Sequence, residues 1–287
     1  MPAIRLPHVD RAAWLALPAV VFVLAVFIFP FAYGLVLSFT PKQGGALANY
    51  IRFFSEPAFY RTIGITLWLA LPATLINVVL SVPIAYRLRR PSTTQRAVTA
   101  LLVVPITLGT VLIADGLLSY LGPQGWLNRV LLGTGLSSEP VRLVHNYTGV
   151  LLSLIISGFP FTFLLTLSYI TGVDPNLPKA AMTLGASPWR QFREIYLPLL
   201  LPGLAVAFCL TFVQAFSVFP SAVLLGAPAG PTRVISIAAW QSAYEDYDYA
   251  LASAVAMLMG VIQLAITLVV LGGRRLLYRG PAAGGKG

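Results

Sequence analysis

Long runs without a charged residue divide the chain into six apolar segments. These runs cover residues 12–41, 62–86, 97–114, 146–173, 195–232 and 249–273. Each can hold a helix of roughly 20 apolar residues, the length that crosses a hydrocarbon core about 30 Å thick. Apolar stretches such as Leu75–Leu80 lack the alternation of a barrel strand, so the spans are expected to be helices. The pattern predicts an all-α membrane protein with one domain, residues 1–287, and spans near 14–37, 63–86, 97–120, 147–170, 199–222 and 250–272.

Composition agrees with a membrane protein and argues against a soluble fold. Hydrophobic residues make up 57% of the chain and charged residues only 10%, whereas ordinary soluble domains carry roughly 25% charged residues. The net charge of +10 comes from basic residues that flank the apolar spans, where topology and anionic lipid already account for them, so no nucleic-acid partner is expected. The single cysteine, Cys209, excludes an internal disulfide and a multi-cysteine metal site, and no metal site is expected.

The distribution of Lys and Arg predicts the orientation in the membrane. With a cytoplasmic N-terminus, 13 of the 19 basic residues fall on cytoplasmic segments and 6 on outer segments. Cytoplasmic loops of membrane proteins carry an excess of Lys and Arg. Both termini are therefore expected in the cytoplasm.

The loop between the fourth and fifth spans has the capping residues of two short helices, over residues 174–197. Asp174 and Pro175 form a start signal for the first helix, and Gly185 ends it. Ser187 and Pro188 repeat the start signal for the second. Leu177, Ala181 and Leu184 lie on one face at helical spacing. This apolar stripe either docks into a partner or packs against the ends of the spans, and periodicity does not separate the two.

The same loop resembles the signature of binding-protein-dependent ABC importer permeases of type I. That signature reads Glu-Ala-Ala, three residues, Gly, nine residues, then Ile-x-Leu-Pro. In this chain the matching residues are Ala180, Ala181, Gly185, Ile195, Leu197 and Pro198. The departure is Lys179, which stands where the family has Glu. Lys179 is either a solvated substitution or a sign that the chain pairs with a second, different permease that keeps the acid.

The resemblance implies a permease in the bacterial inner membrane, with six spans and a cytoplasmic coupling-helix hairpin that seats in an ATPase. It assigns the ATPase coupling to Lys179, Ala180, Ala181, Leu184, Gly185 and Ala186. The expected partners are a second permease subunit, two ATP-binding cassette subunits and an extracytoplasmic solute-binding protein, with a different second permease favoured over a copy. The chain has no Gly-x-x-x-x-Gly-Lys-[Ser/Thr] loop and no catalytic constellation. ATP and Mg²⁺ are therefore expected on the partner ATPase, and this chain is expected not to be an enzyme.

Five residues within the spans are candidates for the solute pathway. Asp115 is the only acid in a predicted span, and it either lines the pathway or reaches water at the outer surface. Polar and aromatic side chains also gather at the end of the fifth span. They are Gln214, Phe216, Ser217 and Phe219. This cluster either lines the solute route or forms hydrogen bonds between helices.

The outer stretch before the sixth span alternates tyrosines with Glu245, Asp246 and Asp248. Tyrosines are typical of a membrane interface, but three acids in four residues favour attraction of a cationic solute or docking of a basic protein surface. The region 216–260 resembles permeases for spermidine and putrescine, which implies a solute that is polyamine-like or another small organic amine. Related permeases carry sugars, phosphonates and metal ions, and a stand-alone secondary transporter is the alternative from another class.

The orientation gives a first testable prediction. Reporter fusions after residues 92 and 284 should read cytoplasmic, and a fusion after residue 135 should read external, because the basic excess holds those segments inside. A C-terminal reporter that reads external would contradict the six-span topology.

Overall fold

The structure is a computed structural model that describes residues 17–277, with side chains described as far as residue 273. Within these residues the regular structure is helical, and six helices are long and apolar enough to cross a membrane. They cover Leu17–Ser38, Pro57–Arg87, Thr93–Gly133, Tyr147–Thr171, Pro188–Phe216 and Tyr249–Gly273. The predicted all-α architecture with six spans is confirmed.

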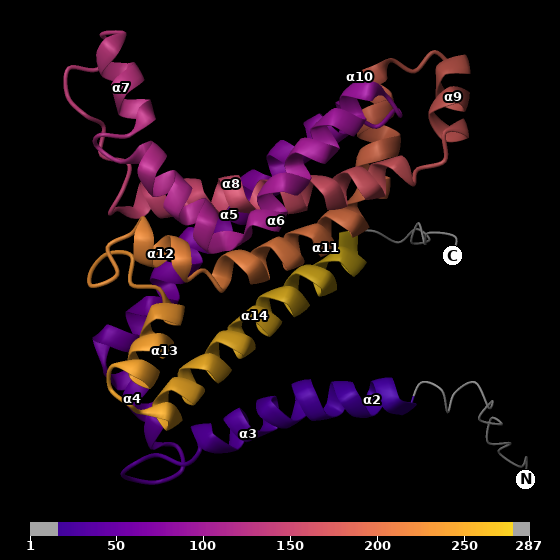
Figure 1. Cartoon of the computed structure of the whole chain (residues 1–287). Coiled ribbons are helices and arrows are strands. Elements are labelled where there is room, and N and C mark those ends of the chain that lie inside the picture. Colours follow the sequence, from indigo (N-terminus) through magenta and orange to yellow (C-terminus); the bar gives the residue numbers. More distant parts are fainter. Residues whose placement is uncertain (1–16, 278–287) are drawn as a thin grey trace, which may run out of the picture. The chain divides into compact units, whose positions relative to one another are not determined.

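The chain divides into two compact units, and the prediction of a single domain stays a prediction. Within the described residues, the first unit contains residues 17–55 and 239–257, and the second contains residues 56–238 and 258–277. Helices of the first unit are α2 (Leu17–Val23), a π-helical turn (Leu24–Ile28), α3 (Phe29–Ser38) and α4 (Ala48–Ser55). The end of α13 (Ile235–Tyr244) and the start of α14 (Tyr249–Leu277) also belong to it. Figure 1 labels the α-helices among these elements.

Polar side chains connect the elements of the first unit. Asn49 of α4 donates its Nδ2 hydrogen to the carbonyl of Ser38 at 3.0 Å, and the hydroxyls of Ser38 and Tyr50 lie 2.7 Å apart. Arg52 of α4 pairs with Asp248, whose carboxylate also accepts the N–H of Leu251 at the start of α14. Asp248 is only 8% exposed. Its carboxylate therefore caps α14 and pairs with the Arg52 side chain inside the unit.

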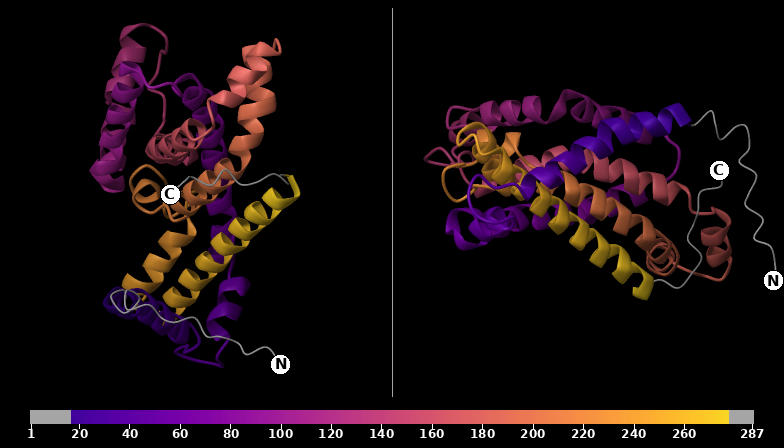
Figure 2. Two further views of the ribbon diagram at one scale, coloured as in Figure 1. Left: turned by 90° about the vertical axis from the view of Figure 1, so that its right-hand side faces the viewer. Right: turned by 90° about the horizontal axis from the view of Figure 1, so that it is seen from below.

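The second unit holds the remaining helices. They are α5 (Pro57–Arg87), α6 (Thr93–Leu121), α7 (Trp126–Gly133), α8 (Tyr147–Thr171), α9 (Asn176–Thr183), α10 (Pro188–Gln191), a π-helical turn (Phe192–Tyr196), α11 (Leu197–Phe216) and α12 (Pro220–Leu224). The start of α13 and most of α14 complete it. Two further views show the same helices from the side and from below (Figure 2).

Small polar residues hold α5, α8 and α11 together. Hydroxyl pairs bridge the helices at 2.7 to 2.9 Å: Ser81 with Thr166, and Thr162 with Thr211. Asn77 of α5 also donates to the carbonyl of Leu154 on α8 at 3.3 Å. In a bilayer no hydrophobic force joins apolar helices, so close packing of small residues and interhelical hydrogen bonds hold them. This explains why hydroxyl and amide side chains are buried in spans of high hydropathy.

Proline and glycine shape the spans. Both π-helical turns end two residues before a proline, Pro30 or Pro198, which cannot donate to the preceding turn. Gly109 has φ 77° and interrupts α6 four residues after Pro105. The fifth span was predicted to reach residue 222, but α11 ends at Phe216. Phe219 leaves the helical region before Pro220 starts α12, because a residue before proline avoids that region.

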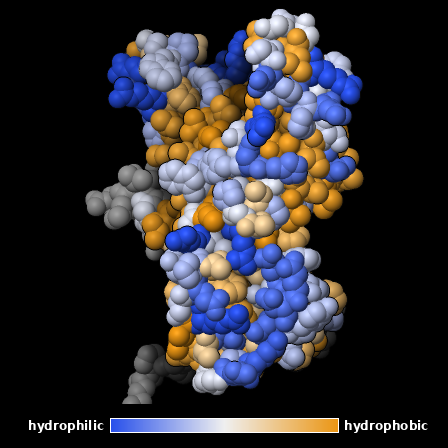
Figure 3. Space-filling view, turned by 90° about the vertical axis from the view of Figure 1, so that its left-hand side faces the viewer, coloured by the Kyte–Doolittle hydropathy of each residue, from blue (hydrophilic) through white to orange (hydrophobic). Residues whose placement is uncertain are grey.

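Large apolar side chains remain on the surface of the chain. On α6 alone Leu101 is 70% exposed and Leu112 is 61% exposed. Broad hydrophobic areas are visible on the face in Figure 3, interrupted by hydrophilic residues. Soluble monomers rarely expose apolar areas of this kind, so these faces are suited to lipid or to another membrane subunit.

Candidate functional site

The hairpin predicted between the fourth and fifth spans is present, and local capping chemistry builds it. The Asp174 carboxylate accepts the N–H of Asn176 at 2.9 Å, and the Asp174 carbonyl accepts the N–H of Leu177 at 3.2 Å. These bonds satisfy donors that the start of a helix leaves open. Asp174 therefore accepts the first open donors of α9, although the helix itself begins two residues after Asp174, at Asn176.

Gly185 reverses the chain after α9. Its φ of 80° lies in the left-handed region, which a side chain disfavours. The N–H of Gly185 donates to the carbonyl of Met182 at 3.0 Å, and the N–H of Ala186 donates to the carbonyl of Ala181 at 2.9 Å. This pair of bonds is a Schellman motif. It gives a physical reason for a glycine four residues after Ala181.

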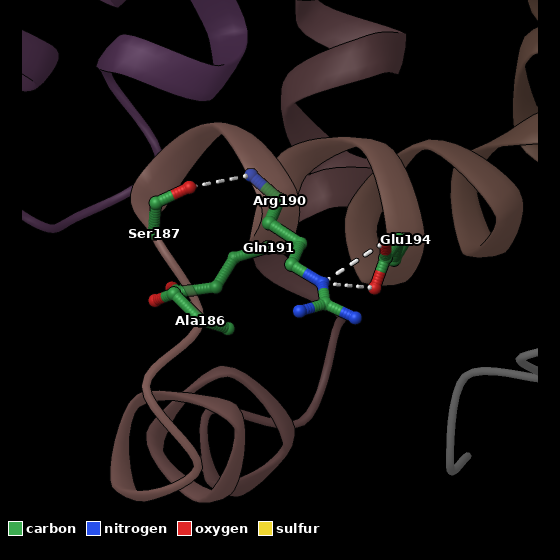
Figure 4. A network of polar contacts seen from close by, with 5 residues as sticks. All are labelled: Ala186, Ser187, Arg190, Gln191 and Glu194. Atoms are coloured by element: carbon green, nitrogen blue, oxygen red, sulfur yellow. Dashed lines mark hydrogen bonds and ion pairs between the residues drawn. The ribbon is translucent and has the colours of Figure 1, made fainter.

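The second arm of the hairpin begins with a side-chain cap. Ser187 Oγ accepts the N–H of Arg190 at 3.3 Å, and Gln191 Nε2 donates back to the carbonyl of Ala186 at 3.0 Å (Figure 4). Arg190 Nε also lies 3.0 Å from Glu194, an exposed pair worth roughly 0.3–0.5 kcal/mol. Gln191 is only 6% exposed, so its bond ties the turn to the second arm.

The first arm is largely uncovered by the described part of the chain. Leu184 is 86% exposed, Met182 is 59% exposed and Leu177 is 46% exposed. Lys179 and Ala180 are also exposed, Ala181 and Ala186 are half-buried, and Pro178 is buried. Figures 1 and 2 show α9 standing beyond the ends of α8 and α11. Of the two alternatives for the apolar stripe, packing against the spans is wrong for Leu184.

The second arm continues directly into a span. Residues Pro188–Phe216 form one helix through the π-helical turn, in which the N–H of Leu197 donates to the carbonyl of Phe192. The sequence predicted a separate short helix here. The second arm and the fifth span are therefore one continuous helical segment.

A cluster of aromatic rings and one arginine joins this helical segment to the end of α5. The sequence analysis did not predict this cluster. The ring centroid of Tyr86 lies 4.8 Å from that of Phe192 and 5.2 Å from that of Tyr196. Arg89 Cζ lies 3.9 Å above the Tyr86 ring, and its Nε donates to the Tyr196 hydroxyl at 3.3 Å. The Tyr86 hydroxyl donates to the carbonyl of Pro188 at 3.2 Å. We call Tyr86, Arg89, Phe192 and Tyr196 the aromatic clamp.

The candidate pathway residues at the end of α11 do not form one surface. Phe216 is 0% exposed and packs on Phe212 at 5.5 Å, so its ring belongs to the core. Ser217 accepts a hydrogen bond from Gln263 of α14 at 2.7 Å, which is the interhelical bond that the sequence left as the alternative. Gln214 is exposed and Phe219 is half-buried. Gln214 and Ser217 are therefore the exposed polar members of this group, and Ser217 is already bonded to α14.

Asp115 lies on α6 in the segment after the break at Gly109, and its side chain is exposed. Apolar side chains nearby on the same helix are exposed as well, among them Val111 at 58% and Leu112 at 61%. A carboxylate in lipid costs several kcal/mol, so its neighbours in the membrane must be water, a solute or polar groups of another subunit.

The three outer acids have different surroundings. Glu245 and Asp246 are exposed. Asp248 is buried and bonded to Arg52 and to the start of α14, so it is not available to a docking protein. A capping residue directly before a predicted helix was the signal that could have identified this role.

Curated relatives are about 30% identical to this chain over the stretches that align. PotB, a spermidine/putrescine transport system permease protein of Salmonella typhimurium strain SL1344, is 32% identical over 186 residues, which is 64% of each chain. The chain therefore matches less than two thirds of that relative's length. A probable sulfate transport system permease protein, cysT of Prototheca wickerhamii, is 28% identical over 216 residues, which is 75% of this chain and 83% of the relative.

Solved structures share the fold. A bacterial alginate ABC transporter in complex with an alginate pentasaccharide-bound periplasmic protein contains a chain that superposes with a TM-score of 0.80 at 23% identity, covering 94% of this chain and 96% of that one. A chain of the MetNI methionine ABC transporter gives 0.62 at 19% identity, covering 76% and 95%. The match to the family "Binding-protein-dependent transport system inner membrane component" covers residues 77–280 and includes the whole hairpin. This chain belongs to that family.

Proposed function

We propose that this chain is a permease subunit of an ATP-driven importer, that it forms half of a solute pathway, and that it couples to a separate ATPase through residues 174–197. The observation that carries the proposal is the exposed first arm of the hairpin. Leu184 and Met182 are held in the open by the turn at Gly185, next to Lys179 and Ala180. An apolar surface of this kind needs a partner in water.

The proposed partners follow from the surfaces. The ATPase covers α9 and binds the ATP and Mg²⁺ for which this chain has no phosphate-binding loop. A second permease, favoured as a different chain, covers part of the exposed apolar helices. A solute-binding protein docks on the outer loop before the sixth span, where Glu245 and Asp246 are exposed. The alginate transporter that shares the fold carries a periplasmic protein, which supports this last partner.

We propose that the solute is cationic and polyamine-like. The PotB relatives are named for spermidine and putrescine, and Asp115 is an exposed acid within the third span. A carboxylate at membrane depth stabilises a cation that has lost its water. The cysT relative, named for sulfate, supports an anion as the second candidate, for which an acid on the path would be unfavourable. The charge of the solute therefore separates the two candidates.

Coupling through the hairpin is tested by Gly185→Val. The left-handed backbone at Gly185 costs a side chain about 1–2 kcal/mol, so the turn should open and misplace α9. We expect solute-stimulated ATP hydrolysis and uptake by the purified complex in vesicles to fall about tenfold, as follows from that cost.

The matched control is Gly135→Val. Gly135 has a similar φ of 73°, and like Gly185 it has open space where a Cβ would lie. Strain alone would affect both variants equally, whereas coupling through the hairpin affects only Gly185→Val. Unchanged uptake in Gly185→Val would contradict the assignment of the hairpin.

The charge of the solute is tested by Asp115→Asn, which keeps the shape of the side chain and removes its charge. Uptake of a polyamine should fall about tenfold or more, since an ion pair in a dry site is worth well over 1.4 kcal/mol. Glu139→Gln removes an exposed acid outside the spans and should transport normally. Normal uptake by Asp115→Asn, together with a co-purified binding protein that prefers sulfate, would contradict the cationic solute.

A further inference from the structure

We propose that Arg89 is a positioning residue that locks the second arm of the hairpin to α5, so that movement of the hairpin is transmitted to α5 and α11 together. The proposal rests on the proposed function and names the contacts through which movement of the hairpin reaches the spans. It concerns the aromatic clamp, in which Tyr86 belongs to the last turn of α5, Arg89 lies two residues after the end of α5, and Phe192 and Tyr196 belong to the π-helical turn before α11.

The contacts of Arg89 are specific to a guanidinium. Its Nη1 donates to the carbonyl of Tyr86 at 2.6 Å, and its Nε donates to the hydroxyl of Tyr196 at 3.3 Å. Its Cζ lies 3.9 Å from the centroid of the Tyr86 ring and 5.3 Å from that of Tyr196. A planar cation can stack on a ring and donate in its own plane at the same time, which the ammonium of lysine cannot do.

Its basic neighbours differ from Arg89. Arg87 and Arg90 are exposed, whereas Arg89 is half-buried within the clamp. All three contribute equally to the excess of basic residues that sets the topology. Arg89 alone of the three has a ring contact or a hydrogen bond from its side chain among the described residues. A role in orientation therefore does not account for its placement.

The aromatic clamp lies between the hairpin and the helices α5 and α11. On one side, Gln191 and the turn at Gly185 connect α9 to the second arm. On the other, the arm continues without a break into α11, and the clamp fixes its base to α5. The hydroxyl of Tyr86 adds a bond to Pro188, the first residue of the arm. Tilting the arm would therefore carry the end of α5 along with α11.

The π-helical turn places the two clamp rings of the arm. Phe192 and Tyr196 begin and end the turn, and both rings lie within 5.2 Å of the Tyr86 ring. Tyr196 is only 7% exposed. A wider turn brings residues four or five apart onto one face, and such turns are frequent at functional sites. The rings thus form one surface against α5.

The test is the number of solute molecules imported per ATP hydrolysed by the assembled complex in vesicles. For Arg89→Ala we expect this ratio to fall about tenfold, equivalent to about 1.4 kcal/mol of lost coupling. Arg89→Lys should recover only part of the ratio, because the charge returns without the planar fork. Arg90→Ala removes the same charge one residue away and should keep the wild-type ratio.

A second variant tests the proposal if the complex does not assemble with Arg89→Ala. Tyr196→Phe retains the ring and removes only the hydroxyl that accepts from Arg89, and it should lower the ratio in the same direction. Wild-type ratios in Tyr196→Phe and in every assembled Arg89 variant would overturn the inference alone. A wild-type complex without ATP-dependent uptake would overturn the proposed function and this inference with it.

Discussion

A bilayer offers no hydrogen-bond partner to a backbone N–H or C=O, and the rest of this structure depends on that constraint. It makes each span a helix and requires prolines within spans to be accommodated by local changes. The π-helical turns before Pro30 and Pro198 are such changes. It also confines sharp reversals, such as the one at Gly185, to places where water can reach the chain. The hairpin is consequently a place where a protein in the aqueous phase can contact an exposed helix, α9.

The hairpin combines an exposed arm with a firmly attached one. The first arm presents Leu184 and Met182 to the surroundings, while the second arm is continuous with α11 and clamped to α5. Helices α5, α8 and α11 are in turn joined by buried hydroxyl pairs such as Ser81 with Thr166. Interhelical hydrogen bonds and close packing hold helices together in a bilayer, so these three helices form the body to which the hairpin is attached.

The sequence predicts features that depend on neighbouring residues, such as spans and helix caps. It does not predict which distant residues come into contact. The spans and the hairpin follow from charge-free runs, from capping residues and from a glycine, all of which act over a few neighbouring residues. The aromatic clamp joins Arg89 to Tyr196 across 107 positions, and Arg89 was counted only as a basic residue at a loop. The ion pair of Arg52 with Asp248 and the burial of Phe216 likewise depend on which helices meet. No periodicity within one segment encodes those contacts.

Site-directed cross-linking shows whether α9 docks on a separate ATPase. The native Cys209 is buried, so a cysteine introduced as Leu184→Cys would be the reactive one. With a short bifunctional thiol reagent, this variant should cross-link to the co-purified ATPase, and the yield should change when ATP is added. Leu136→Cys, at a position 77% exposed in another loop, should give no such product. A complex that contains the ATPase but gives no cross-link from Leu184→Cys would contradict the account.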